Sequence, residues 1–301
     1  ETTAQNSTLD IGTQYQSSLT SVVSTNANAG FSIVKWEGSG AATSVAHGLS
    51  AAPDLVIVKR LDGTTNWQTW YTGAGTSPGS GINRVYLNTT DDNDSSTSNV
   101  FYPDATKINL NSGDHFFNSS GSDYIAYCWH SVTGYSKIGT FTGSGSAKTV
   151  TTGFKPDFVM IKRTIGGDEE WNIIDSRRGG DRRLKADTTA AEVDESSDYV
   201  TFAATSFTIT VTGNASLNNN GDTFLYAAFA KNVASNTTLA DSFKTLKFEG
   251  LGAARSIGGL GFRPDLVWIK SRSNATSHEL NDALRGQPNR LWSDSYNAAS
   301  T

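Results

Sequence analysis

The sequence predicts an all-β protein made of tandem antiparallel β-sandwich modules of the jelly-roll or lectin-like type. First, the stretch at residues 153–163 has close copies at 53–60 and 261–271. Second, the prolines that open the three copies lie about 100 residues apart, a spacing typical of whole domains. Third, short apolar runs alternate with turn residues at intervals of about 8 to 15 residues, without a helical period. We therefore expect domain-sized repeats.

Each copy of the recurring stretch is predicted to be a β-strand. Its proline is tolerated at the first residue of a strand, and a mostly apolar run ending in lysine follows. Alternate side chains of a strand point to opposite faces. One face is β-branched in all copies, whereas the other varies in size: Leu55/Ile57, Phe158/Met160 and Leu266/Trp268. We interpret the uniform face as the module's own core and the variable face as one covered by a loop or a neighbouring module.

Residues 1–30 precede the first repeat and are rich in Ser, Thr, Asn and Gln. Their apolar residues recur at a loosely helical spacing, but the β-branched and hydroxylated content disfavours a stable helix. We predict a linker or attachment arm for this segment.

The first β-sandwich repeat is predicted at residues 31–136. Its expected strands lie at 31–38, 43–47, 53–60, 66–71, 84–88 and 124–132, with a polar loop at 89–99. The second repeat, residues 137–235, shows the same order of elements. Its matching strands lie at 138–143, 156–163, 170–174, 184–189 and 224–229. Short strands with frequent turns indicate an antiparallel sandwich in both repeats.

The third repeat, residues 242–301, is predicted to be incomplete. Its expected strands at 243–250, 265–270, 277–284 and 290–293 match the earlier part of each repeat, but no counterpart of the closing strand follows. Such a module has an unpaired strand edge and an open core. Either the natural chain continues beyond Thr301, which we favour, or a neighbouring chain supplies the strand.

Composition excludes several classes of function. The chain has 24 Lys and Arg against 29 Asp and Glu, so it lacks the basic excess expected of a nucleic-acid-binding protein. No apolar run approaches the roughly 18 residues of a membrane span, so we expect no membrane insertion. Cys128 is the single cysteine, which rules out an intramolecular disulfide, and its apolar surroundings predict a buried thiol rather than a nucleophile.

The sequence carries weak signals for catalysis. Its histidines are not spaced as metal-binding pairs, and residues 250–255 lack the third glycine of the dinucleotide fingerprint. Residues 91–94 offer oxygen ligands suited to Ca²⁺, but without the Gly and terminal Glu of a calcium loop we interpret them as a solvated loop. No pair of carboxylates stands out for glycoside hydrolysis, although any two acids could converge in the fold. We predict a non-enzymatic protein with no catalytic residues, metal or cofactor.

Two groups of residues are candidate ligand contacts. Trp70 and Tyr71 differ from their matches in the second repeat, and an exposed tryptophan can stack on a sugar ring. The alternative is packing against the adjoining module. The second group flanks a Gly-Gly pair that is expected to place it on a hairpin tip: Arg177, Arg178, Arg182 and Arg183. Guanidinium groups suit the phosphates or carboxylates of bacterial glycans, but nearby acids favour local ion pairs.

Several of these motifs together resemble a family of tandem-repeat virion proteins from marine tailed phages. The motifs lie at 31–34 before the Gly-rich turn, 88–90, 225–230 and 261–270. The resemblance covers roughly residues 31–301 and implies lectin-like β-sandwiches in a tail fibre or other surface appendage. It implies no catalytic residues.

The resemblance therefore leads us to expect a phage structural protein, located in the virion outside the host cell, that serves host adhesion or acts as a spacer. Its expected partners are other virion proteins, copies of itself in a trimer that multiplies weak sites, and a host-surface glycan. Two alternatives stay open. One is a head or tail decoration protein whose variable strand face packs on a lattice, and the other is a tailspike glycan depolymerase.

Overall fold

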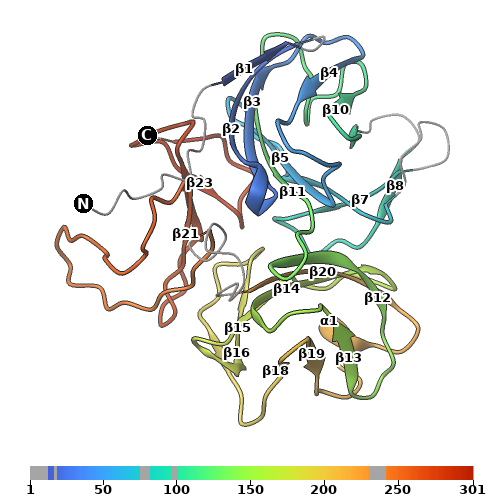
Figure 1. Ribbon diagram of the computed structural model, residues 1–301, viewed down its shortest axis with the longest axis vertical. Helices are drawn as coiled ribbons and strands as arrows, with labels where there is room; N and C mark the ends of the chain where they lie inside the picture. The colour runs from blue at the N-terminus through green and yellow to red at the C-terminus, as the bar shows by residue number, and fades with distance from the viewer. Residues whose placement is uncertain (1–12, 17–18, 75–81, 97–100, 231–241, 301) are drawn as a thin grey trace.

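The computed structural model describes residues 13–16, 19–74, 82–96, 101–230 and 242–300. The prediction of an all-β fold is confirmed, because the regular structure of the described residues consists of antiparallel sheets and two short helical turns, η1 (Ala27–Ala29) and α1 (Ala215–Asn218). Figure 1 shows three lobes around a common centre: the first repeat runs from blue to green, the second from green to tan, and the third is orange and red.

Repeat 1 is a sandwich of a large sheet and a small one. The large sheet has the order β1 (Thr13–Gln16), β2 (Thr20–Asn26), β3 (Phe31–Glu37), β11 (Asp123–Trp129), β5 (Leu55–Arg60), β6 (Gln68–Tyr71), β7 (Ile82–Tyr86), β8 (Asp94–Ser96). The small sheet has the order β4 (Thr43–Ala46), β10 (Lys107–Leu110), β9 (Phe101–Pro103). The recurring strand β5 lies inside the large sheet.

Repeat 2 has the same strand order from β3 onward. Its large sheet is β12 (Ser136–Thr142), β20 (Thr223–Ala230), β14 (Pro156–Ile165), β15 (Asn172–Asp175), β16 (Gly179–Lys185), β17 (Val193–Asp194). Its small sheet is β13 (Lys148–Thr151), β19 (Ser206–Ile209), β18 (Val200–Ala203). The closing strand is central in both repeats, since β11 pairs with β3 and β5, and β20 pairs with β12 and β14.

The two sheets of repeat 2 bury an apolar core between them. Val159 and Ile161, from the uniform face of the recurring strand, are fully buried there with Phe207 of the small sheet and Phe224 of the closing strand. Burial of these side chains supplies the main driving force for the sandwich. The interpretation of the uniform face as the repeat's own core is confirmed for repeats 1 and 2, whereas in repeat 3 Ile269 on this face is 39 % exposed.

Repeat 3 contains the three-stranded sheet β21 (Leu266–Ile269), β22 (Glu279–Asp282), β23 (Leu291–Trp292), which corresponds to β5, β6 and β7. The prediction of a strand at residues 243–250 is wrong, because this segment has no regular structure. A strand needs a hydrogen-bonding neighbour, and in repeats 1 and 2 the neighbour of the opening strand is the closing strand.

The prediction of a linker for residues 1–30 is also wrong in its described part. Strand β1 pairs with β2, and β2 pairs along its length with β3, so this segment extends the sheet of repeat 1. Val23 is fully buried. The β-branched and hydroxylated residues that disfavour a helix are residues that strands accept readily.

Equivalent residues join the repeats in a cyclic order. The indole Nε1 of Trp67 in repeat 1 donates a 3.0 Å hydrogen bond to the Trp292 carbonyl of repeat 3. The indole Nε1 of Trp171 in repeat 2 donates a 2.8 Å hydrogen bond to the Tyr86 carbonyl of repeat 1. His278 occupies the same position in repeat 3 and faces repeat 2. The repeats therefore surround an approximate threefold axis.

Candidate interaction site between the repeats

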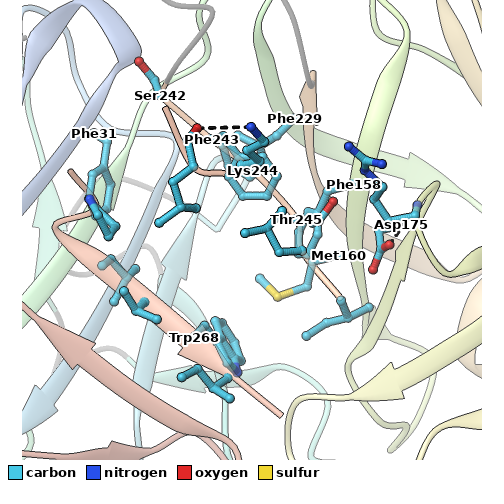
Figure 2. Close-up of a pocket in the computed structure, with 18 of the residues that line it drawn as sticks. Phe31, Phe158, Met160, Asp175, Phe229, Ser242, Phe243, Lys244, Thr245 and Trp268 are labelled. Carbon is cyan, nitrogen blue, oxygen red and sulfur yellow. Dashed lines mark hydrogen bonds between the residues drawn. The ribbon is translucent and has the colours of Figure 1, made fainter. Parts of the chain in front are cut away.

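A cavity of about 570 Å³ lies where the three repeats meet. Each repeat contributes the variable face of its recurring strand: Leu55 and Ile57, Phe158 and Met160, Leu266 and Trp268. In Figure 2, Phe31, Phe158, Phe229 and Trp268 surround this space. The interpretation that a neighbouring module covers the variable face is confirmed. An apolar cavity of this size can accept side chains of a ligand or partner.

The segment that opens repeat 3 passes along this cavity and fills part of it. The Phe243 ring stacks on Phe229 with centroids 5.0 Å apart and meets the edge of Phe158 at 5.3 Å. Thr245 Oγ1 donates a 3.1 Å hydrogen bond to the carboxylate of Asp157. From Leu246 to Gly259 the chain is mostly exposed. Residues 242–245 are thus anchored to repeat 2, and most of the following stretch is exposed at the edge of the cavity.

Ion pairs at the rim of the cavity join repeats 2 and 3. Arg178 is buried and its guanidinium contacts Asp175 at 2.5 Å and Glu192 at 3.1 Å. Arg272 of repeat 3 forms a second ion pair with Glu192 at 2.5 Å. Burial acts to raise the pKa of Glu192, but hydrogen bonds from Arg272 and Arg178 outweigh it and hold the pKa below its usual value. This carboxylate stays ionised near neutral pH.

Trp70 and Tyr71, predicted as exposed ligand contacts, are 5 % and 2 % exposed and belong to the central core. Burial raises the pKa of Tyr71, whose hydroxyl bonds to the side chain of Thr164 in repeat 2. The alternative, packing against the adjoining module, is the one that the structure supports. A surface contact with a glycan by these two residues is excluded in this conformation.

The basic cluster matches the prediction in part, because Arg177 and Arg178 lie in the turn between β15 and β16, whereas Arg182 and Arg183 lie within β16. Gly179 and Gly180 begin strand β16, and a Cβ on Gly180 would lie 1.9 Å from the Val200 carbonyl, so close packing rather than a hairpin tip explains this glycine. Arg182 pairs with Asp194 at 2.7 Å. Arg183 lies over the ring of Tyr199 at 4.7 Å. Of the predicted contacts, Arg177 is exposed, whereas Arg178, Arg182 and Arg183 are engaged locally.

The lysine that follows the apolar run of each recurring stretch is a site residue that the sequence analysis missed. Lys59 and Lys162 are fully buried, and burial lowers their pKa to about 7 and about 8. Their ammonium groups donate to main-chain carbonyls of their own repeat, Thr65 at 3.0 Å and Glu169 at 2.5 Å. The signal was visible in the sequence, because lysine recurs at this position in all three copies.

The His278 ring is held between the repeats as a neutral group. Its Nδ1 accepts a 2.9 Å hydrogen bond from the Trp268 indole, so the proton of the neutral ring lies on Nε2. The buried Nε2 has no hydrogen-bond partner among the described residues, and the main chain of Lys185 in repeat 2 lies near the ring. Burial, together with the nearby charge of Lys270, lowers the pKa of His278 to about 3. His278 therefore positions Trp268 at the wall of the cavity.

Other candidate chemistry is not assembled in the described residues. No group of three or more His, Cys, Asp or Glu side chains gathers there in a way that could hold a metal ion. Burial raises the pKa of the Cys128 thiol to about 12, which confirms a buried thiol. Within the same residues, no helix is long and apolar enough to cross a membrane.

The fold and the cavity define an all-β protein of tandem antiparallel sandwich repeats that pack around a shared apolar centre. The chain belongs to the family described as a domain of unknown function, DUF7483, whose model matches residues 10–232 and 238–301. Comparison with curated proteins and with solved structures gave no match.

Proposed function

We propose that this protein is a non-enzymatic structural component of a phage particle, placed in a tail fibre or similar surface appendage. The cyclic set of contacts between the repeats is the observation that carries the proposal. Buried lysine and tryptophan side chains donate hydrogen bonds to main-chain carbonyls of the adjoining repeat, and the partly exposed Arg272 forms an ion pair with Glu192 of repeat 2. Such contacts suit a rigid building block, because these polar side chains hold the repeats together.

Host adhesion is the proposed role within the appendage, and a spacer role is its alternative. Arg177 is the predicted glycan contact whose side chain reaches solvent. A single exposed guanidinium binds weakly, so adhesion requires several copies acting together, for which we propose a trimer with other virion proteins at its ends. A spacer predicts that Arg177→Glu leaves adsorption unchanged, whereas an adhesin predicts a loss.

The two alternative functions have less support. A decoration protein was expected to place the variable strand face on a lattice, but neighbouring repeats cover that face. A glycan depolymerase needs two carboxylates facing a cleft. At the central cavity, the carboxylates of Asp175 and Glu192 are paired with Arg178 instead.

A reconstruction of the intact particle, with this chain located and its copies counted, tests the proposal. Three chains, or a small multiple, at a protruding fibre are the expected result. Many copies covering the capsid or the tail tube would overturn the fibre assignment and favour a decoration protein. Release of reducing sugar from host polysaccharide by the purified chain would overturn the non-enzymatic assignment.

A further inference from the structure

The three junctions between the repeats use equivalent positions, but one junction has a different residue type. Trp67, Trp171 and His278 directly precede β6, β15 and β22, the strands that pair with the recurring strands. The main chain that each of them faces belongs to the adjoining repeat, at equivalent positions of the register: Trp292, Tyr86 and Lys185. A histidine therefore stands at the junction of repeats 2 and 3, where the other two junctions have a tryptophan.

Tryptophan and histidine respond differently to acid. An indole N–H is a hydrogen-bond donor that keeps its proton over the whole range in which proteins are folded. An imidazole in water takes up a second proton with a pKa of about 6.5. Of the three equivalent side chains, that of His278 alone gains a charge in mild acid.

The contacts of the His278 ring admit its neutral form only. Nδ1 accepts the 2.9 Å hydrogen bond from the Trp268 indole, and the two rings meet edge to face with centroids 5.9 Å apart. A proton on Nδ1 would set two N–H donors against each other. His278 is fully buried, so water cannot take the place of the lost acceptor. The charged ring can be accommodated only if it leaves this position.

The charged groups around His278 also oppose a positive charge. Lys270, after β21, and Arg178, in the turn between β15 and β16, both disfavour the imidazolium. The carboxylate of Asp294, after β23, accepts a 2.8 Å hydrogen bond from the main-chain N–H of His278. Arg178 is paired in turn with two carboxylates: Asp175 and Glu192. Burial and the two cations outweigh the nearby carboxylates, so the pKa of His278 lies well below its usual value.

We propose that the junction between repeats 2 and 3 is acid-sensitive and opens when His278 binds a proton, while the two tryptophan junctions stay closed. Opening hydrates the imidazolium and removes Trp268 from its hydrogen bond. It also uncovers apolar side chains of the variable faces, such as Met160 of repeat 2 and Leu266 of repeat 3. The proposal adds a second conformation to a protein that otherwise serves as a rigid building block.

The sign and size of the effect follow from proton linkage. The pKa of His278 is about 3 with the junction closed and about 6.5 once the ring is hydrated, so the closed state loses stability as the pH falls below 6.5. The equilibrium constant for opening should therefore be about thirtyfold larger at pH 5.0 than at pH 7.5. Glu192 stays ionised at pH 5.0, because its pKa is held below the usual 4.5, so its ion pair with Arg272 is kept.

The junction of repeats 1 and 2 responds to acid in the opposite direction. The buried Asp187 carboxyl accepts a hydrogen bond from the main-chain N–H of Trp171. Burial raises the pKa of Asp187 to about 7. A group with a raised pKa in the folded chain binds its proton more tightly there, so acid stabilises the folded form at this junction. Opening in mild acid is thus expected at one junction rather than at all of them.

One main-chain amide at each junction reports on its opening. The N–H of Glu192 donates to the Arg272 carbonyl at 2.8 Å across the junction of repeats 2 and 3. At the other two junctions, the N–H of Thr65 donates to Tyr296 at 2.9 Å and that of Glu169 donates to Thr90 at 2.8 Å: these amides are internal controls.

Amide hydrogen exchange of the full chain, resolved to single residues and corrected for the intrinsic effect of pH, tests the proposal. We expect the protection factor of the Glu192 amide to fall about thirtyfold between pH 7.5 and pH 5.0. The protection factors of the Thr65 and Glu169 amides should change less than threefold.

Variants of the chain assign the effect to one histidine. His278→Gln keeps an acceptor and a donor but does not titrate, so the Glu192 amide should have the same protection at both pH values. His278→Trp introduces the residue of the other two repeats and serves as a second non-titrating variant if His278→Gln does not fold. His115→Gln, at an exposed histidine of repeat 1, is the matched control and should keep the thirtyfold fall.

Three results would overturn the proposal. The first is an unchanged protection factor of the Glu192 amide in the wild type at pH 5.0. The second is a thirtyfold fall that persists in the non-titrating variants. The third is an equal fall at the Thr65 and Glu169 amides, because acid would then act on the whole fold, for example through the buried His47, whose pKa is also lowered by burial.

Discussion

Lys162 Nζ in the second repeat donates a 2.7 Å hydrogen bond to the main-chain carbonyl of Thr90 in the first. Equivalent bonds join Lys59 to the carbonyl of Tyr296 at 3.1 Å, and Lys270 to that of Thr189 at 3.2 Å. The lysine that follows the apolar run of each recurring stretch therefore bonds to the next repeat in the cycle. Lys162 also donates to the Glu169 carbonyl of its own repeat, so folding of that repeat is coupled to its packing against repeat 1.

Replacing Lys162 by methionine should lower the free energy of unfolding by about 2 kcal/mol, because the buried carbonyls of Thr90 and Glu169 lose their donor. Removal of a buried charge offsets part of this loss. Urea unfolding at pH 7 measures the change. Lys137→Met, at an exposed lysine, is the control and should change stability by less than about 0.5 kcal/mol. Equal effects of the two variants would contradict a structural role for the buried lysine.

The free energy of unfolding should depend on pH through the titration of Lys162. Burial lowers the pKa of Lys162 from 10.5 to about 8. Below pH 8 both the folded and the unfolded chain hold the proton, so the full cost of burying the ammonium group is present. Between pH 8 and 10.5 the unfolded chain keeps a proton that the folded chain has released. Stability contributed by this site therefore rises with pH, by up to about 1.4 kcal/mol per pH unit.

Urea unfolding of the wild type and of Lys162→Met at pH 7.5, 8.5 and 9.5 isolates this contribution. The difference in free energy of unfolding between the two proteins should grow with pH in favour of the wild type. A constant difference would show that Lys162 stays protonated in the folded chain throughout this range.

Most strands of the large sheets could be predicted from the sequence, whereas the small-sheet strands at residues 101–110 and 200–209 and the contacts between repeats could not. Residues 53–60 and 156–163 align because apolar alternation and the opening proline recur together. Lys59 donates to the main-chain carbonyl of Tyr296, which is 237 positions away in the sequence. Every residue has such a carbonyl, so the sequence does not indicate which one accepts the bond. Trp70 differs from its match in repeat 2 because its neighbours differ, and the same difference suggested a ligand contact. Sequence variation between repeats cannot distinguish these two causes.

Gly143→Ala should destabilise repeat 2, because the added Cβ would lie 2.0 Å from the main-chain carbonyl of Asn219. Main chain at a turn yields less readily than a flexible side chain, so we expect a loss of about 2 kcal/mol. Thermal melting followed by circular dichroism measures it. Gly250→Ala, at the equivalent position of repeat 3, should melt like the wild type. If both variants melt alike, the turn before β20 does not pack as described.

Arg178→Ala tests whether the basic cluster serves stability or recognition. The substitution leaves the carboxylates of Asp175 and Glu192 without their buried guanidinium partner, so unfolding should become easier by about 3 kcal/mol or more. Arg177→Ala is the matched control one residue away, and its exposed side chain should contribute less than about 0.5 kcal/mol. Both variants are measured by urea unfolding at pH 7 and by binding to host cells. A large stability loss for Arg178→Ala alone supports its place at the junction of repeats 2 and 3. If Arg178→Ala leaves stability unchanged but abolishes binding to host cells, Arg178 would instead be a glycan contact.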